Sequence, residues 1–198
     1  MRRFVGHASL LKKLFFKDRW FIGIRKRSRD LLPYYNTDGY FVLRPPPDRF
    51  YADPFLFKFE NINYLFFEDY RYEKAKGIIS VLTVNDSGSP GTEAVALERP
   101  YHLSFPFVFA WAGEIWMIPE TSSNQTIELY RAKRFPEQWA LETVLMNNLH
   151  ASDSVVLFQA EKCWLFTSIE CKKEPTYDNL SLFYSNSLLG DWQSHPLN

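Results

Sequence analysis

The sequence predicts an all-β protein, a β-propeller of which this chain supplies about three blades. Three observations carry this prediction. Short apolar stretches recur about every fifty residues, each is followed by a turn and an aromatic-led strand, and almost no helical periodicity interrupts them. Four short strands per repeat are typical of propeller blades, whereas an immunoglobulin-type sandwich would explain the strands but not the period.

Each repeat is predicted to contain four strands in the same order. An apolar inner strand comes first, an aromatic-led strand follows a polar turn, and two further strands complete the blade. The predicted strands span 52–57, 64–69, 78–84 and 94–98 in the first repeat, 104–109, 116–121, 127–132 and 140–145 in the second, and 153–158, 164–168, 180–185 and a last one from about Trp192 in the third.

The repeats define the expected organisation of the chain. Residues 48–198 would form three blades, at about 48–99, 100–149 and 150–198, and residues 1–47 a basic segment whose strands at 19–24 and 40–43 complete the last blade. A propeller needs about four to eight blades to close its ring. We therefore expect a missing C-terminal part of a longer protein, or a partner chain, to complete it.

Composition narrows the class of function. The 23 basic and 23 acidic residues balance, which argues against nucleic acid as a partner, and 46 % apolar residues are enough for a sizeable core. No apolar run is long enough to span a membrane. Cys163 and Cys171 are too few for a disulfide scaffold and lack zinc-site spacing. With no glycine-rich phosphate loop and no nucleophile motif, we expect no cofactor and no metal.

Positive charge gathers at the N-terminus. Residues 1–30 hold ten Lys and Arg against two acids, so the remainder of the chain is acidic. The stretch 9–17 would form a short basic amphipathic helix, which either packs its leucines on the domain or contacts an anionic membrane. No secretory signal follows these charges. We therefore expect a cytoplasmic location, with peripheral membrane contact as an option.

Three segments resemble one family. These are Phe50-Tyr-Ala-Asp-Pro-Phe-Leu-Phe57, Glu98-Arg-Pro-Tyr-His-Leu-Ser-Phe-Pro-Phe-Val-Phe109 and Glu114-Ile-Trp-Met-Ile-Pro-Glu-Thr-Ser122. They look like the N-terminal domain of the glucosamine inositolphosphorylceramide transferase family, from about Phe16 onward. That domain is similar to the five-bladed propellers of family 43 glycoside hydrolases. The resemblance implies five blades and a role in glycan or glycolipid assembly.

Carboxylates near the starts of the inner strands are the candidate catalytic groups. Inner strands line the axis of a propeller, so residues distant in sequence converge there. The resemblance implies Asp53 as a general base and Asp153 as the aspartate that tunes the acid, although an alignment on Phe158 sets Asp153 one residue before the Asp53 position. Glu120 is the internal candidate for the general acid that glycoside hydrolysis requires. The alternative is that Asp53 caps a turn and that Glu120 and Asp153 are solvated.

A second set of residues is predicted to bind substrate. Glu68 matches Glu120 in the first repeat, His102 precedes an inner strand, two rings offer sugar stacking, and one arginine would meet an acidic group. The set is Glu68, Tyr70, Arg71, His102 and Trp111. Each has a structural alternative in packing, in a satisfied hydrogen bond or in solvation.

The sequence thus favours recognition of a glycan or glycosylated small molecule in surface-polysaccharide or glycolipid biosynthesis. Two alternatives remain open. One is an inverting glycoside hydrolase with Asp53 as general base, and the other is a non-catalytic scaffold for protein interactions.

Overall fold

The computed structural model describes residues 19–26, 39–170 and 179–198. The predicted amphipathic stretch 9–17 and Cys171 lie outside these residues. Within them the chain is all-β apart from the 3₁₀ turn η1 (Ser122–Asn124), which confirms the predicted fold class. No helix in this part of the chain is long and apolar enough to cross a bilayer.

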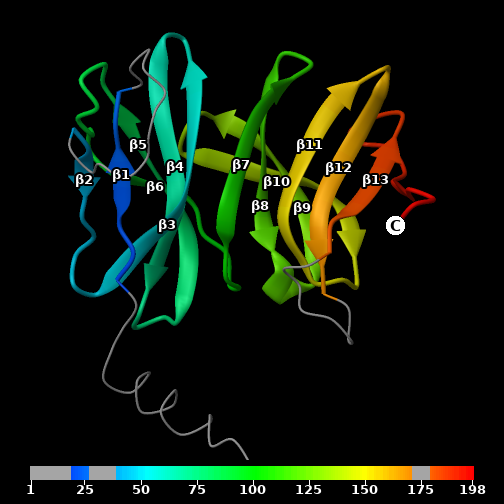
Figure 1. The fold of residues 1–198 in the computed structure, drawn as a ribbon, viewed down its shortest axis with the longest axis horizontal. Helices are drawn as coiled ribbons and strands as arrows, with labels where there is room; N and C mark the ends of the chain where they lie inside the picture. The colour runs from blue at the N-terminus through cyan, green and yellow to red at the C-terminus, as the bar shows by residue number, and fades with distance from the viewer. Residues whose placement is uncertain (1–18, 27–38, 171–178) are drawn as a thin grey trace, which may run out of the picture.

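Three antiparallel four-stranded sheets stand side by side, with β7 between β3 and β11 (Figure 1). In each sheet the strands follow one another in chain order, so each sheet is a single meander. We refer to the sheets as blades one to three. Blade one holds β3 (Arg49–Phe59), β4 (Ile62–Arg71), β5 (Lys76–Val84) and β6 (Ala94–Leu97). Blade two holds β7 (Ser104–Trp111), β8 (Glu114–Thr121), β9 (Thr126–Arg134) and β10 (Gln138–Asn147). Blade three holds β11 (Ala151–Gln159), β12 (Lys162–Ile169), β13 (Ser181–Ser185) and β14 (Gln193–Ser194).

Apolar side chains fill the seams between neighbouring blades. Between blades one and two, Phe66, Met117 and Tyr130 are fully buried, and the ring of Phe135 contacts Phe59 with centroids 5.2 Å apart. Contacts of the same kind join blades two and three, where Cys163 is buried as a free thiol. Burial of such rings is the main favourable term holding blade to blade, so most of the aromatic residues serve packing.

All three inner strands carry the same irregularity. In β3 the pairing with β4 passes from Ala52↔Glu68 to Phe55↔Phe66, so that two residues of β3 lie opposite one of β4. This is a β-bulge. Its first residue, Asp53, has φ 49°, in the left-handed region that Asp tolerates better than most residues.

The same bulge recurs in β7 and β11. Phe105 (φ 42°) and Asp153 (φ 55°) take the place of Asp53, at identical positions in the pairing of their strands. Asp153 is therefore equivalent to Asp53, and the offset of one residue obtained by aligning on Phe158 is wrong. Leu157, not Phe158, occupies the place of Phe57, because both pair with the corresponding residue of the second strand.

The N-terminal strands form a small separate sheet. β1 (Ile22–Ile24) pairs antiparallel with β2 (Phe41–Leu43), and both are shorter than the predicted 19–24 and 40–43. Ile22 packs on Tyr51 and Phe67 of blade one. This contact holds the small sheet against the outer face of blade one, which is the face turned away from blade two.

Candidate functional site

Four carboxyl groups from three blades gather where the bulges lie. Asp53 and Asp153 come from the inner strands, and Glu68 and Glu120 from the second strands directly beside them. The charges of these groups act on one another: Glu68 is affected by Asp53 and Glu120, and Glu120 by Asp153 and Asp53. We call these four residues the carboxylate cluster. The structure thus brings together the three predicted catalytic residues and Glu68.

Two hydrogen bonds across the seams fix the cluster. An oxygen of Asp53 accepts the backbone N–H of Phe105 at 3.2 Å, and Glu120 Oε2 accepts the backbone N–H of Asp153 at 3.4 Å. Each bond joins a carboxylate of one blade to the bulge of the next. Because the bulge residue is displaced from the regular ladder, its N–H is available to a side chain. The predicted turn cap for Asp53 is therefore not what the structure contains.

His102 adjoins Glu68 at the seam of blades one and two. Its Nδ1 accepts the backbone N–H of Gly77 at 2.9 Å, and its Nε2 lies 3.6 Å from Glu68 Oε1. Burial lowers the pKa of His102, against the opposing charge of Asp53. The neutral ring then carries its proton on Nε2, on the side of Glu68. No hydrogen bond from a described residue satisfies the carboxyl of Glu68, which is only 6 % exposed.

Burial and like charges shift the titration of the cluster. Desolvation, followed by the charges of Asp53 and Glu120, raises the pKa of Glu68 to about 8. Desolvation and the charges of the two aspartates raise the pKa of Glu120 to about 7, against hydrogen bonds from Asp153 and Ser152. The pKa of Asp153 is also raised, first by burial and then by Asp53. The two glutamates can therefore hold protons near neutral pH and donate hydrogen bonds.

Three predicted substrate-binding residues have different surroundings. Tyr70 shares the face of β4 with Glu68, stacks on Phe50 with centroids 4.7 Å apart, and lies 5.8 Å from the His102 ring, so it borders the cluster. The structure does not bring Arg71 or Trp111 to the cluster. They are taken up by other contacts: Arg71 by an ion pair with Asp69 on the opposite face, and Trp111 by stacking on Phe158 at the far end of β7.

A second polar cluster was not predicted. Asp69, fully buried on the outer face of blade one, bonds to both Arg49 and Arg71, while Tyr51 donates a hydrogen bond to Glu93 at 2.6 Å. The sequence signal for this second cluster was the acidic pair Glu68-Asp69 within an apolar stretch. Adjacent residues of a strand face opposite sides, so a carboxylate lies on each face of β4. Within the described ranges no three His, Cys, Asp or Glu side chains are placed to hold a metal ion.

The sequence of the chain is similar to those of one transferase family. Residues 43–198 match the family model described as glucosamine inositolphosphorylceramide transferase 1, N-terminal. The chain is 38 % identical over 159 residues to a glucosamine inositolphosphorylceramide transferase 1 of Oryza sativa subsp. japonica and 37 % identical over 157 residues to that of Arabidopsis thaliana. Each match covers 77 % of this chain and 21 % and 20 % of the respective relative, so the chain spans about a fifth of their length.

Solved structures with a similar fold are glycoside hydrolases. A family 117 enzyme of Zobellia galactanivorans superposes with a TM-score of 0.62 at 15 % identity, covering 90 % of this chain and 62 % of that enzyme. An exo-β-1,3-galactanase of Phanerochaete chrysosporium gives 0.60 at 14 % identity, covering 81 % and 41 %. At such low identity these likenesses support the fold alone.

Proposed function

The chain belongs to the glucosamine inositolphosphorylceramide transferase 1 N-terminal family, and from this premise we propose that its carboxylate cluster binds a sugar unit during glycan or glycolipid assembly. Membership in this family supports the carbohydrate context. The transferase activity of the full-length relatives, four-fifths of whose length lies beyond the match, is not assigned to this chain.

One observation carries the proposal: the same bulge recurs in three blades and sets Asp53, Glu68, Glu120 and Asp153 around one place. Sugar hydroxyls both donate and accept hydrogen bonds. Carboxyl oxygens accept such bonds, and a glutamate that holds its proton donates one, so the cluster offers both kinds of partner. His102 Nε2–H adds a further donor beside Glu68.

A glycan-array screen of the intact protein tests this proposal, with Asp53→Asn measured alongside. The proposal expects wild-type binding to at least one glycan class and a loss of about tenfold or more in the variant, as for the removal of a charged hydrogen-bond acceptor. No binding by well-folded wild-type protein would overturn it and favour the interaction scaffold.

Inverting glycoside hydrolysis is a second candidate, favoured by the raised pKa of Glu120, about 7. In such a mechanism Glu120 would protonate the leaving oxygen, and Asp53 would take a proton from the water that attacks the anomeric carbon. Release of reducing sugar by the wild type, lost in both Asp53→Asn and Glu120→Gln, would establish it. Binding without release would exclude it for that glycan.

A further inference from the structure

The sheet of β1 and β2 presents a basic, aromatic outward face. The pairing Ile22↔Leu43 places Phe21 beside Arg44 and Arg25 beside Tyr40 on the side turned away from blade one. The guanidinium of Arg44 lies 5.5 Å from the centre of the Phe21 ring, and that of Arg25 lies 4.8 Å from the centre of the Tyr40 ring. These are cation–π contacts, and neither guanidinium donates a hydrogen bond to a residue that the structure describes.

A pocket of about 130 Å³ lies at one end of this face. Its lining includes Arg19, Trp20, Phe21 and Arg44. Trp20 is 62 % exposed and Phe21 52 % exposed, although both are large apolar side chains. Neither Arg19 nor Arg44 forms an ion pair with any residue that the structure describes.

Charge on this part of the molecule is strongly one-sided. The described segments 19–26 and 39–50 contain one acid, Asp48, which pairs with Arg49. Arg49 also pairs with Asp69 and Glu93, so the basic residues of these segments without an ion pair to a described residue are Arg19, Arg25, Lys26 and Arg44. The surface is therefore complementary to anions, while its exposed rings are of the kind that settles at a membrane–water interface.

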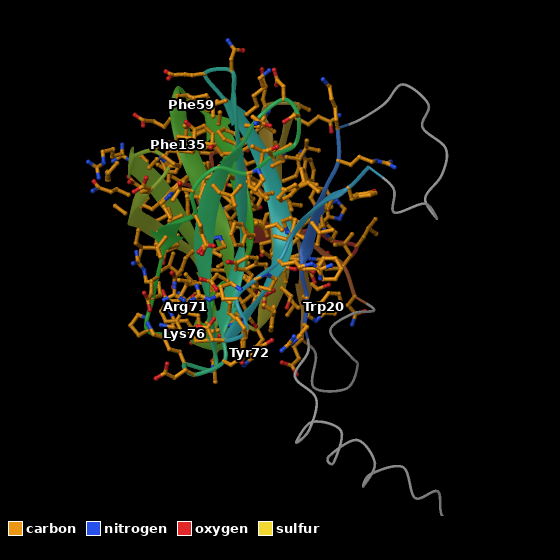
Figure 2. The ribbon with its side chains drawn as sticks, turned by 90° about the vertical axis from the view of Figure 1, so that its left-hand side faces the viewer. Trp20, Phe59, Arg71, Tyr72, Lys76 and Phe135 are labelled. Atoms are coloured by element: carbon orange, nitrogen blue, oxygen red, sulfur yellow. The ribbon has the colours of Figure 1, made fainter. Side chains whose placement is uncertain are left out.

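Figure 2 shows which end of the molecule carries this surface. Trp20 lies at the same end as Arg71, Tyr72 and Lys76, while Phe59 and Phe135 lie at the opposite end. β3 begins at Arg49, which pairs with Arg71, and Asp53 follows four residues later. The two members of the carboxylate cluster in blade one, Asp53 and Glu68, are thus in the half of that blade nearer to Trp20.

We propose that the face formed by Arg19, Trp20, Phe21 and Arg44 docks on an anionic phospholipid surface. The guanidinium groups bind lipid phosphates, and the two rings enter the headgroup region. The docked face then lies at the same end of the molecule as Asp53 and Glu68 of the carboxylate cluster. The docking itself does not depend on the proposed sugar binding.

Vesicle flotation tests the proposal with the whole 198-residue protein. Vesicles of phosphatidylcholine alone are compared with vesicles containing about one third phosphatidylserine. We expect binding to the anionic vesicles only, weakened by added salt. In the double variant Arg19→Gln/Arg44→Gln we expect binding to fall about 25-fold, since each basic residue near an anionic surface contributes roughly fivefold. Trp20→Ala is expected to weaken binding as well.

The matched control is Lys133→Gln/Arg134→Gln. It removes the same charge from two exposed residues next to Phe135, at the opposite end of the molecule. Equal loss of binding in this control, undiminished binding of Arg19→Gln/Arg44→Gln, or equal binding to neutral vesicles would each overturn the proposal. Displacement from vesicles by millimolar inorganic phosphate at constant ionic strength would overturn it too, in favour of a site for a soluble phosphate. So would a wild type that binds no vesicles, in which case another protein segment covers the face. Sugar binding on a glycan array reports separately on the carboxylate cluster.

Discussion

The carboxylate of Asp53 on blade one accepts the backbone N–H of Phe105 on blade two at 3.2 Å. Asp53 thus links blade one to blade two and also belongs to the carboxylate cluster. The two roles can be separated by substitution, because an asparagine oxygen accepts the same hydrogen bond without the charge.

We expect Asp53→Asn to unfold near the wild-type temperature, whereas Asp53→Ala loses about 1–3 kcal/mol, because the Phe105 N–H loses its acceptor and alanine is strained at φ 49°. Both variants should lose sugar binding. Thermal unfolding and glycan binding measure the two effects, with the exposed Asp191→Asn as control. If Asp53→Asn binds as the wild type does, the aspartate is a seam residue only.

Glu68 predicts a pH dependence of stability. Its pKa is about 8 in the folded chain, against 4.5 as its ordinary value, so between these pH values the folded state holds a proton that the unfolded chain has released. Stability therefore falls as pH rises across this range. Glu68→Gln removes this penalty, and we expect the variant to gain on the order of 2 kcal/mol relative to wild type at pH 9, and little at pH 5.

Urea unfolding at the two pH values measures the difference. The exposed Glu114→Gln is the control and should follow the wild type at both. An equal effect of Glu68→Gln at pH 5 and pH 9 would contradict the shifted titration.

Gly77 is predicted to be the least replaceable glycine of the first seam. A Cβ there would clash with the carbonyl oxygen of Leu103 and lie 2.7 Å from Glu68 Oε1. Since a backbone carbonyl cannot turn away, Gly77→Ala should cost about 1–3 kcal/mol and disturb the His102 hydrogen bond. In Gly190→Ala the nearest atom is the rotatable Ser185 Oγ at 2.9 Å, so a smaller loss is expected. Equal melting temperatures for the two variants would argue against the close seam.

The ion pairs of Asp69 are buried and those of Glu98 are exposed, so removing the two acids should differ in its cost to stability. Asp69→Ala leaves Arg71 without its ion-pair partner, while Arg49 keeps Asp48 and Glu93, and should cost about 2–3 kcal/mol. Glu98→Ala removes the partner of Lys74 and Lys76 in a half-exposed position and should cost less than about 1 kcal/mol. Chemical denaturation compares them, and a small loss in Asp69→Ala would show that its arginines find other partners.

The repeat made most of the fold predictable. Alternating apolar residues and polar turns located the strands to within a few residues, because both signals are local. The bulge of β11 was harder to locate from the sequence, because the proline that follows Asp53 and Phe105 is missing after Asp153. The exposed Phe158 was therefore aligned with Phe57 in place of Leu157. Arg71 faces the side of β4 opposite to Glu68, and Trp111 lies at the end of β7 away from the bulge, so neither joins the cluster. The ion pair of Asp69 depends on residues 20 positions apart, which no local pattern reports.

The bulges also divide each inner strand into two halves. A change of length in one half need not turn the side chains of the other half to the opposite face. In a regular strand, one inserted or deleted residue turns every later side chain to the other face. In β3 the extra residue is accommodated by the left-handed conformation of Asp53. Phe55 and Phe57, which follow it, therefore still face the seam. Blade two already carries a phenylalanine, Phe105, where its neighbours carry aspartates, and its seam keeps the same pairing. Substitution at positions 53, 105 and 153 can therefore change the side chains at the bulges while the packing between the blades keeps its register.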